Sequence, residues 1–429
     1  MEIGIGLLGC GTVGQAVVKL LNEKGAHYAR RTESQLVLHQ VLVKNAEKPR
    51  EGLQQEQITT DPDQILENPD IQVVIEVMGG VEESRDYLLK ALHGGKHVVT
   101  ANKALMAKHG AELFDAATEN GCALYYEAAV AGGIPIIQTL KRSLASNALH
   151  SVYGIINGTT NYILSAMTEA GRGFDEVLAE AQHKGFAESD PTDDIEGYDA
   201  VYKLAILASL IFEQRIPVDA IHRVGIQRIS AQDIAHAKEL GYVIKLLAIA
   251  KRGESGFEAR VPPTMIPIHH PLASVNGVYN ALLVQGDAVG DLMFYGQGAG
   301  GLPTASAVVS DLLNIVVEMD APPNLLMSCQ HPGEEAMLAA ADQVMNRYYL
   351  RLQAEDRTGV LGQLGVLMGQ AEMIIHTLTQ KKNSPGQAEL VLITHPVSEL
   401  KLRQVVAKIQ QLDIIHSVDS IIRVEDFTA

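Results

Sequence analysis

A glycine-rich turn near the start of the chain restricts the fold more than any other feature. The apolar residues 3–8 lead into the turn, and a helical pattern of apolar residues follows at once. In such a strand–turn–helix unit the first glycine permits a tight turn, and the second lets the backbone approach a pyrophosphate. The third glycine lets the helix pack close to the strand.

The N-terminus of that helix adds N–H donors and the positive end of the helix dipole, which favour phosphate. The pattern therefore predicts a dinucleotide-binding turn, and a glycine turn of packing value alone is the alternative. The residues expected to line the phosphates are Gly9, Gly11, Thr12, Val13 and Gly14.

Strands and helices alternate beyond this turn. Apolar runs at residues 36–43, 73–77 and 97–100 are separated by helical patterns, of which the clearest covers residues 82–93. This alternation predicts an α/β fold with a Rossmann-type, doubly wound parallel sheet in residues 1–130.

The remaining sequence divides into three parts. Residues 131–318 mix strand-like and helical runs, which predicts an α+β substrate and dimerisation domain whose end, residues 296–318, could return to the first domain. Residues 319–348 hold three prolines and predict a linker. Residues 349–429 run strand, helix, strand, strand, helix, strand, the order of a ferredoxin-like module.

Charge and composition limit the partners of the chain. Lys and Arg number 34 and Asp and Glu number 51, so the net charge is −17. Such an acidic chain is a poor candidate for non-specific binding to nucleic acid or to an anionic membrane. No basic leader precedes the first apolar run, and no stretch reaches the ~20 apolar residues of a membrane span. The three cysteines lack metal-type spacing, and their odd number fits a reducing cytoplasm.

The residues after the second predicted strand bear on the choice of cofactor. NAD binders normally place an acid there for the ribose 2′-hydroxyl, whereas here Lys44 ends the strand, with Lys48 and Arg50 soon after. A cation at this position suits a 2′-phosphate and favours NADP over NAD, with use of both as the main alternative. An ordinary solvated lysine would also explain Lys44.

Two lysines and a group of acids are candidates for chemistry. Lys103 follows the strand at residues 97–100, at the sheet edge where α/β folds build their sites, although a surface lysine fits equally well. Asp199 and Lys203 are four residues apart and share one helix face, with Asp194 just before them. The apolar run after Lys203 would lower the pKa of the lysine and make it a usable proton donor. A solvated acidic loop with one stabilising ion pair is the alternative.

At these residues the chain resembles the homoserine dehydrogenases, in the long bacterial form with a C-terminal ACT module. The resemblance spans the whole chain. The stretches that carry it are Gly9-x-Gly11-x-x-Gly14 and residues 101–103, 127–135, 154–164 and 188–203.

The resemblance implies NAD(P)-dependent, reversible reduction of L-aspartate 4-semialdehyde to L-homoserine, on the route to threonine, methionine and isoleucine. It makes Lys203 the proton donor to the aldehyde oxygen and places Lys103 beside that oxygen and the nicotinamide. It assigns the substrate ammonium to Glu188 and Asp199, with Asp194 as an orienting partner. Two ammonium groups suit the negative charge that hydride attack builds on the carbonyl oxygen.

Further ligand sets follow from the resemblance alone. The family binds a monovalent cation, Na⁺ or K⁺, and its ligands match the Glu127 region and the backbone carbonyls of Val130, Gly132 and Ile134. Two glycines match turns near the cofactor, namely Gly185 and Gly300. The family is dimeric or tetrameric through its middle domain, which implies a homo-oligomer.

The tail resembles ACT modules through Asp356-Arg357-x-Gly359 after a strand. Thr358 stands where the family usually has Pro, and the turn at residues 370–375 is about two residues shorter than usual. Feedback inhibition by threonine is therefore a hypothesis, and a structural or dimerising tail is the alternative.

Two other functions remain open at this point. A Rossmann enzyme that forms a thioester on cysteine needs a nucleophilic Cys near a His, a context that Cys122 lacks. A non-catalytic sensor of a dinucleotide and an amino acid would not need Lys203.

Overall fold

The computed structural model describes residues 1–253, 256–319, 335–340 and 343–427. These residues form two compact units. The first unit comprises Met1–Val152, Val201–Ile221 and Asn280–Ala336. The second unit comprises Tyr153–Ala200, His222–Tyr279 and Met337–Ala429.

The first unit contains a six-stranded parallel sheet in the order β3-β2-β1-β4-β5-β6, which confirms the Rossmann-type prediction. The order reverses between β1 and β4, which is the point where such sheets bind ligands. Its elements are β1 (Glu2–Leu8), α1 (Thr12–Thr32), β2 (Gln35–Leu42), β3 (Ile58–Thr59), α2 (Asp63–Leu66), β4 (Val73–Glu76), α3 (Glu82–His93), β5 (His97–Thr100), α4 (Lys103–Glu119) and β6 (Leu124–Tyr125).

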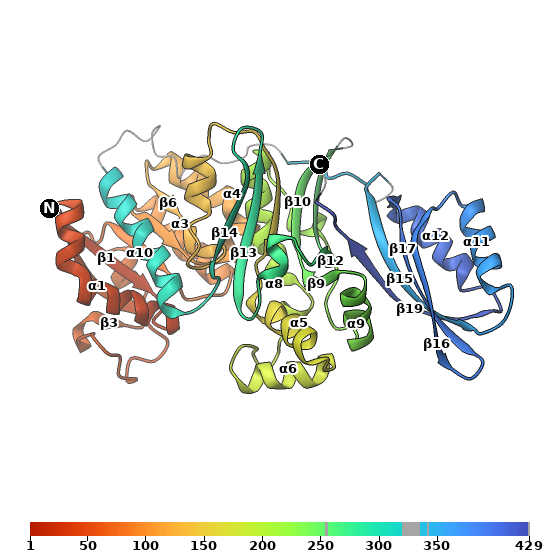
Figure 1. Cartoon of the computed structure of the whole chain (residues 1–429). Helices are drawn as coiled ribbons and strands as arrows, with labels where there is room; N and C mark the ends of the chain where they lie inside the picture. Colours follow the sequence, from red (N-terminus) through yellow and green to blue (C-terminus); the bar gives the residue numbers. More distant parts are fainter. Residues whose placement is uncertain (254–255, 320–334, 341–342, 428–429) are drawn as a thin grey trace. The chain divides into compact units, whose positions relative to one another are not determined.

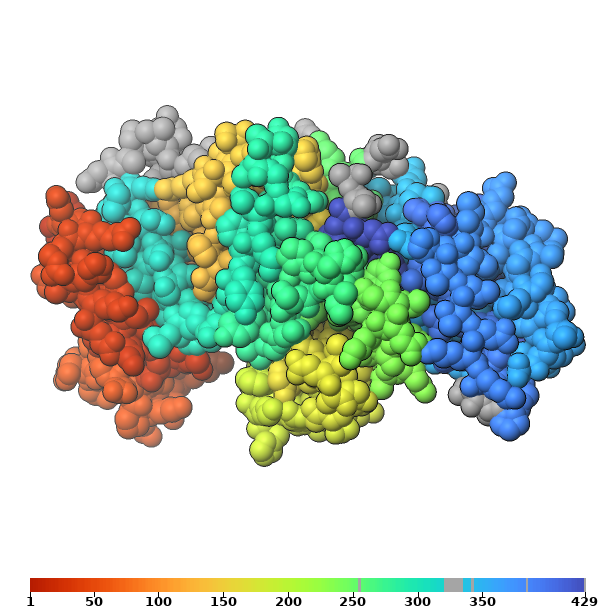
Figure 2. Space-filling view, in the orientation of Figure 1, coloured from red at the N-terminus to blue at the C-terminus, as the bar shows by residue number. Residues whose placement is uncertain are grey.

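Later segments complete the first unit. Helix α10 (Gly301–Glu318) packs beside α1, and both contribute buried side chains to the core that contains β1 (Figure 1). Strands β13 (Tyr279–Gly286) and β14 (Gly290–Gln297) precede α10, and β14 is an edge strand. Figure 2 shows the surface of these strands on the viewed face, and two large side chains of β14, Met293 and Tyr295, are exposed.

Strand β7 (Leu149–Ile155) and helix α8 (Tyr198–Phe212) each begin in one unit and end in the other. The second unit also contains α5 (Gly158–Ala170), α6 (Phe174–His183), α7 (Thr192–Ile195), β8 (His222–Arg223), α9 (Ala231–Glu239), β9 (Tyr242–Leu246), β10 (Ala248–Gly253), β11 (Gly256–Val261) and β12 (Pro263–Pro267). Strands β10 and β11 are antiparallel, and β11 pairs in parallel with β8.

The C-terminal part follows the predicted order of strands and helices. Its elements are β15 (Met345–Glu355), α11 (Val360–Gln370), β16 (Ile375–Ser384), β17 (Gln387–Thr394), the short β18 (Val397–Ser398), α12 (Glu399–Ile409) and β19 (Ile415–Val424). These strands do not form a separate sheet. The order is β16-β17-β15-β19-β12-β9, so the sheet continues through β19 into two strands of the preceding segment.

Only part of the predicted linker, residues 319–348, lies within the described residues. Strand β15 begins at Met345, so the last residues assigned to the linker belong to a strand. The three prolines on which that prediction rests, Pro322, Pro323 and Pro332, lie outside the described residues, as does Cys329. The three-part domain division stays a prediction. Among the described residues, no helix is long and apolar enough to cross a lipid bilayer.

A buried ion network joins α9 to the C-terminal strands. The Arg351 guanidinium of β15 donates to the Asp233 carboxylate at 2.8 Å and to Asp419 at 3.1 Å. His236 of α9 lies 2.7 Å from a carboxylate oxygen of Glu389 on β17. Asp233 is fully buried and Arg351 is nearly so. The C-terminal part is therefore held to the rest of the second unit by paired charges as well as by the shared sheet.

We expect the substitution Arg351→Leu to lower the free energy of unfolding by about 3–5 kcal/mol, because it leaves a buried carboxylate without its cation. Urea denaturation measures this change. The matched control is Arg357→Leu, which removes an exposed pair with Glu355 and should change stability by less than about 1 kcal/mol. Equal effects of the two substitutions would contradict a structural role for the network.

The same network sets a pH dependence. Burial opposes ionisation of Asp233, but its bonds to Arg351 and Ser230 outweigh burial and hold the pKa of the carboxyl below its usual value. The unfolded state therefore binds more protons in acid. The stabilisation is complete above the ordinary Asp pKa of about 3.9 and is lost as the pH falls through the lower folded-state pKa.

Candidate active site

The geometry explains differently why each of the three positions in the N-terminal turn is a glycine. Gly9 has φ +99°, and a Cβ there would lie 2.7 Å from the Cα atom of Met78. A Cβ at Gly14 would lie 2.3 Å from the carbonyl oxygen of Gly9, so only glycine allows α1 to begin this close to the strand. Gly11 is exposed, and a Cβ there would have no neighbour within 4 Å. The open side of the turn is thus at Gly11, as a pyrophosphate requires.

A buried acid shapes the neighbouring loop. Glu76 ends β4 and is fully buried. Its carboxylate accepts hydrogen bonds from the Thr100 hydroxyl at 2.6 Å and from the backbone N–H groups of Met78 and Gly79 at 2.9 and 3.2 Å. Burial raises the pKa of Glu76, and these bonds oppose that rise. Glu76 therefore fixes the loop that follows β4 at the switch point of the sheet.

Lys103 is placed by the residues just before it. Asn102 caps α4 by accepting the backbone N–H of Leu105 at 3.1 Å, and its amide donates to the carbonyl of Gly80 at 2.5 Å. The Thr100 hydroxyl accepts the Asn102 N–H at 3.0 Å. These bonds hold Lys103, the first residue of α4, at the carboxyl edge of β5.

Two cations follow β2. Lys44 is exposed, as expected for a residue that could meet a 2′-phosphate. Arg50 donates to the carbonyls of Asn45 and Lys48 at 3.0 and 2.7 Å. Its guanidinium also lies beside the Cys10 thiol in the glycine turn, where burial raises the thiol pKa and bonds from Gln15 and Arg50 oppose that rise. This link between Arg50 and the turn is tertiary, so the spacing of the residues does not reveal it.

The second unit brings two of the predicted acids together. The amide nitrogen of Asn157 donates to Asp194 at 2.6 Å and to Asp199 at 3.0 Å. Asn157 and Asp199 are buried, and Asp194 is half-buried. Asp194 lies on the short helix α7 and Asp199 in the first turn of α8. No sequence pattern indicates that an asparagine joins them.

The other predicted residues lie in different surroundings. Lys203 is buried on α8, one turn after Asp199. Glu188 is exposed between α6 and α7, and its backbone carbonyl accepts the Gln182 amide at 3.0 Å. Gly185 has φ +74° in the same exposed stretch. Gly300, with φ +117°, precedes α10, and a Cβ on the next residue, Gly301, would lie 3.1 Å from the carbonyl of Thr12.

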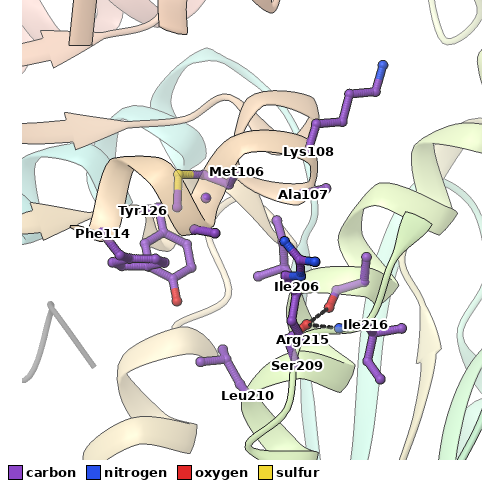
Figure 3. Close-up of a pocket in the computed structure, with 13 residues that line it drawn as sticks. Met106, Ala107, Lys108, Phe114, Tyr126, Ile206, Ser209, Leu210, Arg215 and Ile216 are labelled. Carbon is purple, nitrogen blue, oxygen red and sulfur yellow. Dashed lines mark hydrogen bonds between the residues drawn. The ribbon is translucent and has the colours of Figure 1, made fainter. Parts of the chain in front are cut away.

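A pocket of about 50 Å³ lies between α4 and α8 in the first unit (Figure 3). Met106 and Ile206 line it, each three residues after a predicted catalytic lysine. Residues three apart share a helix face, so the faces that meet at the pocket are the faces that carry Lys103 and Lys203. The pocket itself is lined by neither lysine.

The region expected to bind a monovalent cation is buried and acidic. Both carboxylate oxygens of Glu127 accept backbone N–H groups, from Ile137 at 2.7 Å and Gln138 at 2.8 Å. The Glu127 N–H donates to Asp311 at 2.7 Å. Burial raises the pKa of Glu127, and burial with the nearby Glu127 charge raises that of Asp311.

The turn after Glu127 is suited to carbonyl ligands. Ala131 and Gly132 both have positive φ, and a Cβ at Gly132 would lie 2.5 Å from the Gly298 carbonyl oxygen. The second carboxylate oxygen of Asp311 is buried without a hydrogen-bond partner among the described residues. No cluster of three or more His, Cys, Asp or Glu side chains suited to a metal occurs in the described part of the chain. The residues present thus fit a monovalent cation held by backbone oxygens better than a transition metal.

The structure argues against Cys122 as a nucleophile. Cys122 is almost completely buried. Its sulfur lies 3.7 Å from the carbonyl oxygen of Leu92 and 3.5 Å from that of Asn120. A thiol enclosed in this way is structural rather than reactive.

Comparison with known proteins gives consistent matches. A family model described as "Homoserine dehydrogenase" matches residues 135–313, and one described as "Homoserine dehydrogenase, NAD binding domain" matches residues 9–127. A homoserine dehydrogenase of Synechocystis sp. is 46% identical over 434 residues, which cover 99% of this chain and 100% of that protein.

Solved structures of homoserine dehydrogenases are also similar to this chain. A homoserine dehydrogenase from Thiobacillus denitrificans has a TM-score of 0.95 and 41% identity, over 100% of this chain and 99% of that one. A hyperthermophilic archaeal homoserine dehydrogenase in complex with NADPH has a TM-score of 0.63 and 26% identity, over 74% of this chain and 98% of its own. The resemblance to the homoserine dehydrogenases found in the sequence is confirmed.

Proposed function

The chain belongs to the homoserine dehydrogenase family and is an NAD(P)-dependent oxidoreductase of amino-acid biosynthesis, and we propose that it reversibly reduces L-aspartate 4-semialdehyde to L-homoserine. The observation that carries the proposal is the pair of acids, Asp194 and Asp199, held by Asn157 and followed one helical turn later by the buried Lys203. A zwitterionic substrate needs carboxylates for its ammonium and a proton donor for its carbonyl oxygen. The product would serve the formation of threonine, methionine and isoleucine.

The two lysines act at the carbonyl oxygen. When bound, NAD(P)H supplies the hydride. Lys203 donates the proton that the developing alkoxide accepts, and it takes that proton back in the oxidation of homoserine. Lys103, at the edge of the parallel sheet, stabilises the negative charge on the same oxygen and faces the nicotinamide end of the cofactor. The bonds of Asn102 and Thr100 support this placement of Lys103.

The acids act at the other end of the substrate. Asp199 and Glu188 bind the ammonium, and Asp194 orients Asp199 through their common partner Asn157. Glu188 is exposed and stands in a stretch with a left-handed glycine, Gly185. The local charge supports the assignment, since residues 151–200 hold 10 acidic and 2 basic groups.

The cofactor is assigned to the glycine turn. Gly9, Gly11, Thr12, Val13 and Gly14 would hold the pyrophosphate, with Gly185 and Gly300 in contact with other parts of the cofactor. Lys44 supports NADP as the preferred cofactor, and Arg50 adds a second cation between the end of β2 and the turn. Use of NAD as well remains the alternative.

A monovalent cation, Na⁺ or K⁺, is assigned to the turn after Glu127. Its ligands would be backbone carbonyls of Val130, Gly132 and Ile134, close to the Glu127 carboxylate. Burial raises the pKa of Glu127 and of Asp311, and a cation bound there would favour the ionised form of both carboxyl groups. The cation would fix the turn that approaches Gly298 and thereby the segment that leads to Gly300.

The C-terminal part is assigned as an ACT regulatory module for threonine. Its order of strands and helices and its sheet shared with β12 and β9 support a route from this part to the rest of the second unit. Threonine added to the assay should inhibit, and activity unchanged at millimolar threonine would leave the module a structural role.

The assembly and location follow the family pattern. We assign a homo-oligomer, dimer or tetramer, and the exposed Met293 and Tyr295 on the edge strand β14 support a contact with a second copy. We assign the protein to the cytoplasm, with no nucleic-acid or membrane partner, on the basis of its charge and its cysteine content.

The direct test is a spectrophotometric assay of homoserine oxidation with NADP⁺ and with NAD⁺, each with and without K⁺. The proposal predicts turnover that depends on homoserine, a higher kcat/KM with NADP⁺, and activation by the cation. Absence of homoserine-dependent reduction of either cofactor would overturn it.

A further inference from the structure

One buried side chain joins three elements of the second unit. Asn157 follows β7, caps α5, and reaches both α7 and α8 through its amide nitrogen. Only about 5% of its surface is exposed. Its partners Asp194 and Asp199 are 37 and 42 residues away in the sequence, so the contact is tertiary.

The orientation of the Asn157 amide is fixed by its bonds. Its oxygen accepts the backbone N–H of Thr160 at 2.8 Å and the hydroxyl of Thr160 at 2.8 Å. The oxygen must face these donors, so the NH₂ group must face the two carboxylates. Both N–H bonds are therefore directed to acids, one to each.

This geometry sets the distance between the two acids. The two N–H bonds of an amide diverge by about 120°, so acceptor oxygens at these distances lie roughly 5 Å apart. One ammonium nitrogen can bridge such a gap with two hydrogen bonds of about 2.8 Å. Without the amide, two neighbouring carboxylates would separate or share a proton.

We propose that Asn157 is a positioning residue that holds the carboxylates of Asp194 and Asp199 at the spacing required by the substrate ammonium. This rests on the proposed function and extends the role of Asp194, which would contact the ammonium as well as orient Asp199. Asn157 does not touch the reacting atoms in this scheme, and it acts through the two acids. Its effect is therefore on KM for the amino-acid substrate and on the pH dependence of that KM.

The informative variant is Asn157→Asp. It keeps the size of the side chain and the oxygen that caps α5, but it replaces the NH₂ donor by an oxygen that faces two acids. The introduced carboxyl would gain a proton more readily than an ordinary Asp, because like charges raise the pKa of a carboxyl. The charged groups that contact it are Asp194 and Asp199. The next charged group along α5 is Lys245 of β9, which donates to Asn161, one helical turn after Asn157.

The expected result for Asn157→Asp is a KM for aspartate semialdehyde raised about tenfold or more at pH 8, with a smaller fall in kcat and an unchanged KM for NADPH. The increase in KM should be smaller at pH 6, because the introduced carboxyl donates one bond again once it is protonated. The matched control is Asn157→Ser, which can still cap α5 but cannot reach the acids. Its KM should be raised at both pH values.

Two outcomes separate this inference from the proposed function. Kinetics of folded Asn157→Asp equal to wild type, or a loss of thermal stability with unchanged KM, would overturn the inference, because a cap alone would then explain Asn157. The variant Asp199→Asn tests the function independently. If its KM equals that of wild type, the assignment of the ammonium fails whatever Asn157 does.

Discussion

Replacement of Lys203 by Ala should lower kcat for homoserine oxidation by about 10²–10⁴-fold, the range over which a positioned general acid or base contributes. Binding of NADPH, followed by its fluorescence, should remain close to that of wild type. The physical reason is that Lys203 is a buried lysine of α8, one turn after an acid assigned to the substrate ammonium. No other lysine of α8 could replace it, since Lys203 is the single lysine in residues 198–212.

Two further variants make this result specific. Lys203→Arg keeps the positive charge but holds its proton at all working pH values, so it should stabilise the oxyanion without transferring a proton and remain slow. Lys184→Ala removes an exposed lysine that pairs with Glu180, and it should leave kcat unchanged. Near-normal kcat in a folded Lys203→Ala enzyme would contradict the assignment of the proton donor.

Substitution of Gly11 by Val should weaken NADPH binding by about 30-fold or more while the protein keeps its thermal stability. Gly11 has φ −82°, and a Cβ would meet no atom within 4 Å, so the fold has room for the new side chain. That room is where the pyrophosphate must approach the backbone, so valine would exclude the cofactor. A loss of about 2 kcal/mol corresponds to the stated change in affinity.

The matched control for Gly11 is three residues away. In Gly14→Val the new side chain would collide with the carbonyl oxygen of Gly9, 2.3 Å from the Cβ position, so this variant should lose stability itself. Calorimetry and NADPH titration on both variants distinguish the two effects. Wild-type affinity in Gly11→Val would mean that the turn does not take the pyrophosphate.

The parts of the fold that could be predicted from the sequence are those fixed by short-range patterns. The turn from Gly9 to Gly14 is local, because a side chain at Gly9 or Gly14 would collide with atoms of the same strand–turn–helix unit or of the neighbouring strand end. The parallel sheet follows from alternating apolar runs, and Asp199 and Lys203 share a face because they lie four apart in one helix. Each of these inferences needs only residues that are close in sequence.

The residues that the sequence did not reveal depend on distant partners. Asn157 reads as an ordinary helix cap until Asp194 and Asp199 fold against it. Glu76 is one acid at the end of an apolar strand, and its role comes from Thr100 on the next strand. Such acids at strand ends are a signal that could have been used, since a charge in a buried strand needs a partner.

The sheet that joins the C-terminal part to the preceding segment could not be predicted from the sequence either. The pairing of Thr264 with Arg423 and of Met265 with Val424 joins β12 to β19 across more than a third of the chain. Strand patterns show that a strand exists but not which edge it joins, because backbone hydrogen bonds are the same for any partner. The ions that reinforce this joint, Arg351 and Asp233, are likewise 118 residues apart.

Recognition of the substrate ammonium can be measured most directly by comparing L-homoserine with 4-hydroxybutyrate, which lacks only the amino group, in the same NADP⁺-reduction assay. With 4-hydroxybutyrate bound, the acids around Asn157 would have no ammonium group to bind. We expect its kcat/KM to be lower by about 10³-fold or more, as for sites built to bind a polar group that the analogue lacks. Comparable kcat/KM values for the two compounds would contradict the role assigned to Asp199, Asp194 and Glu188.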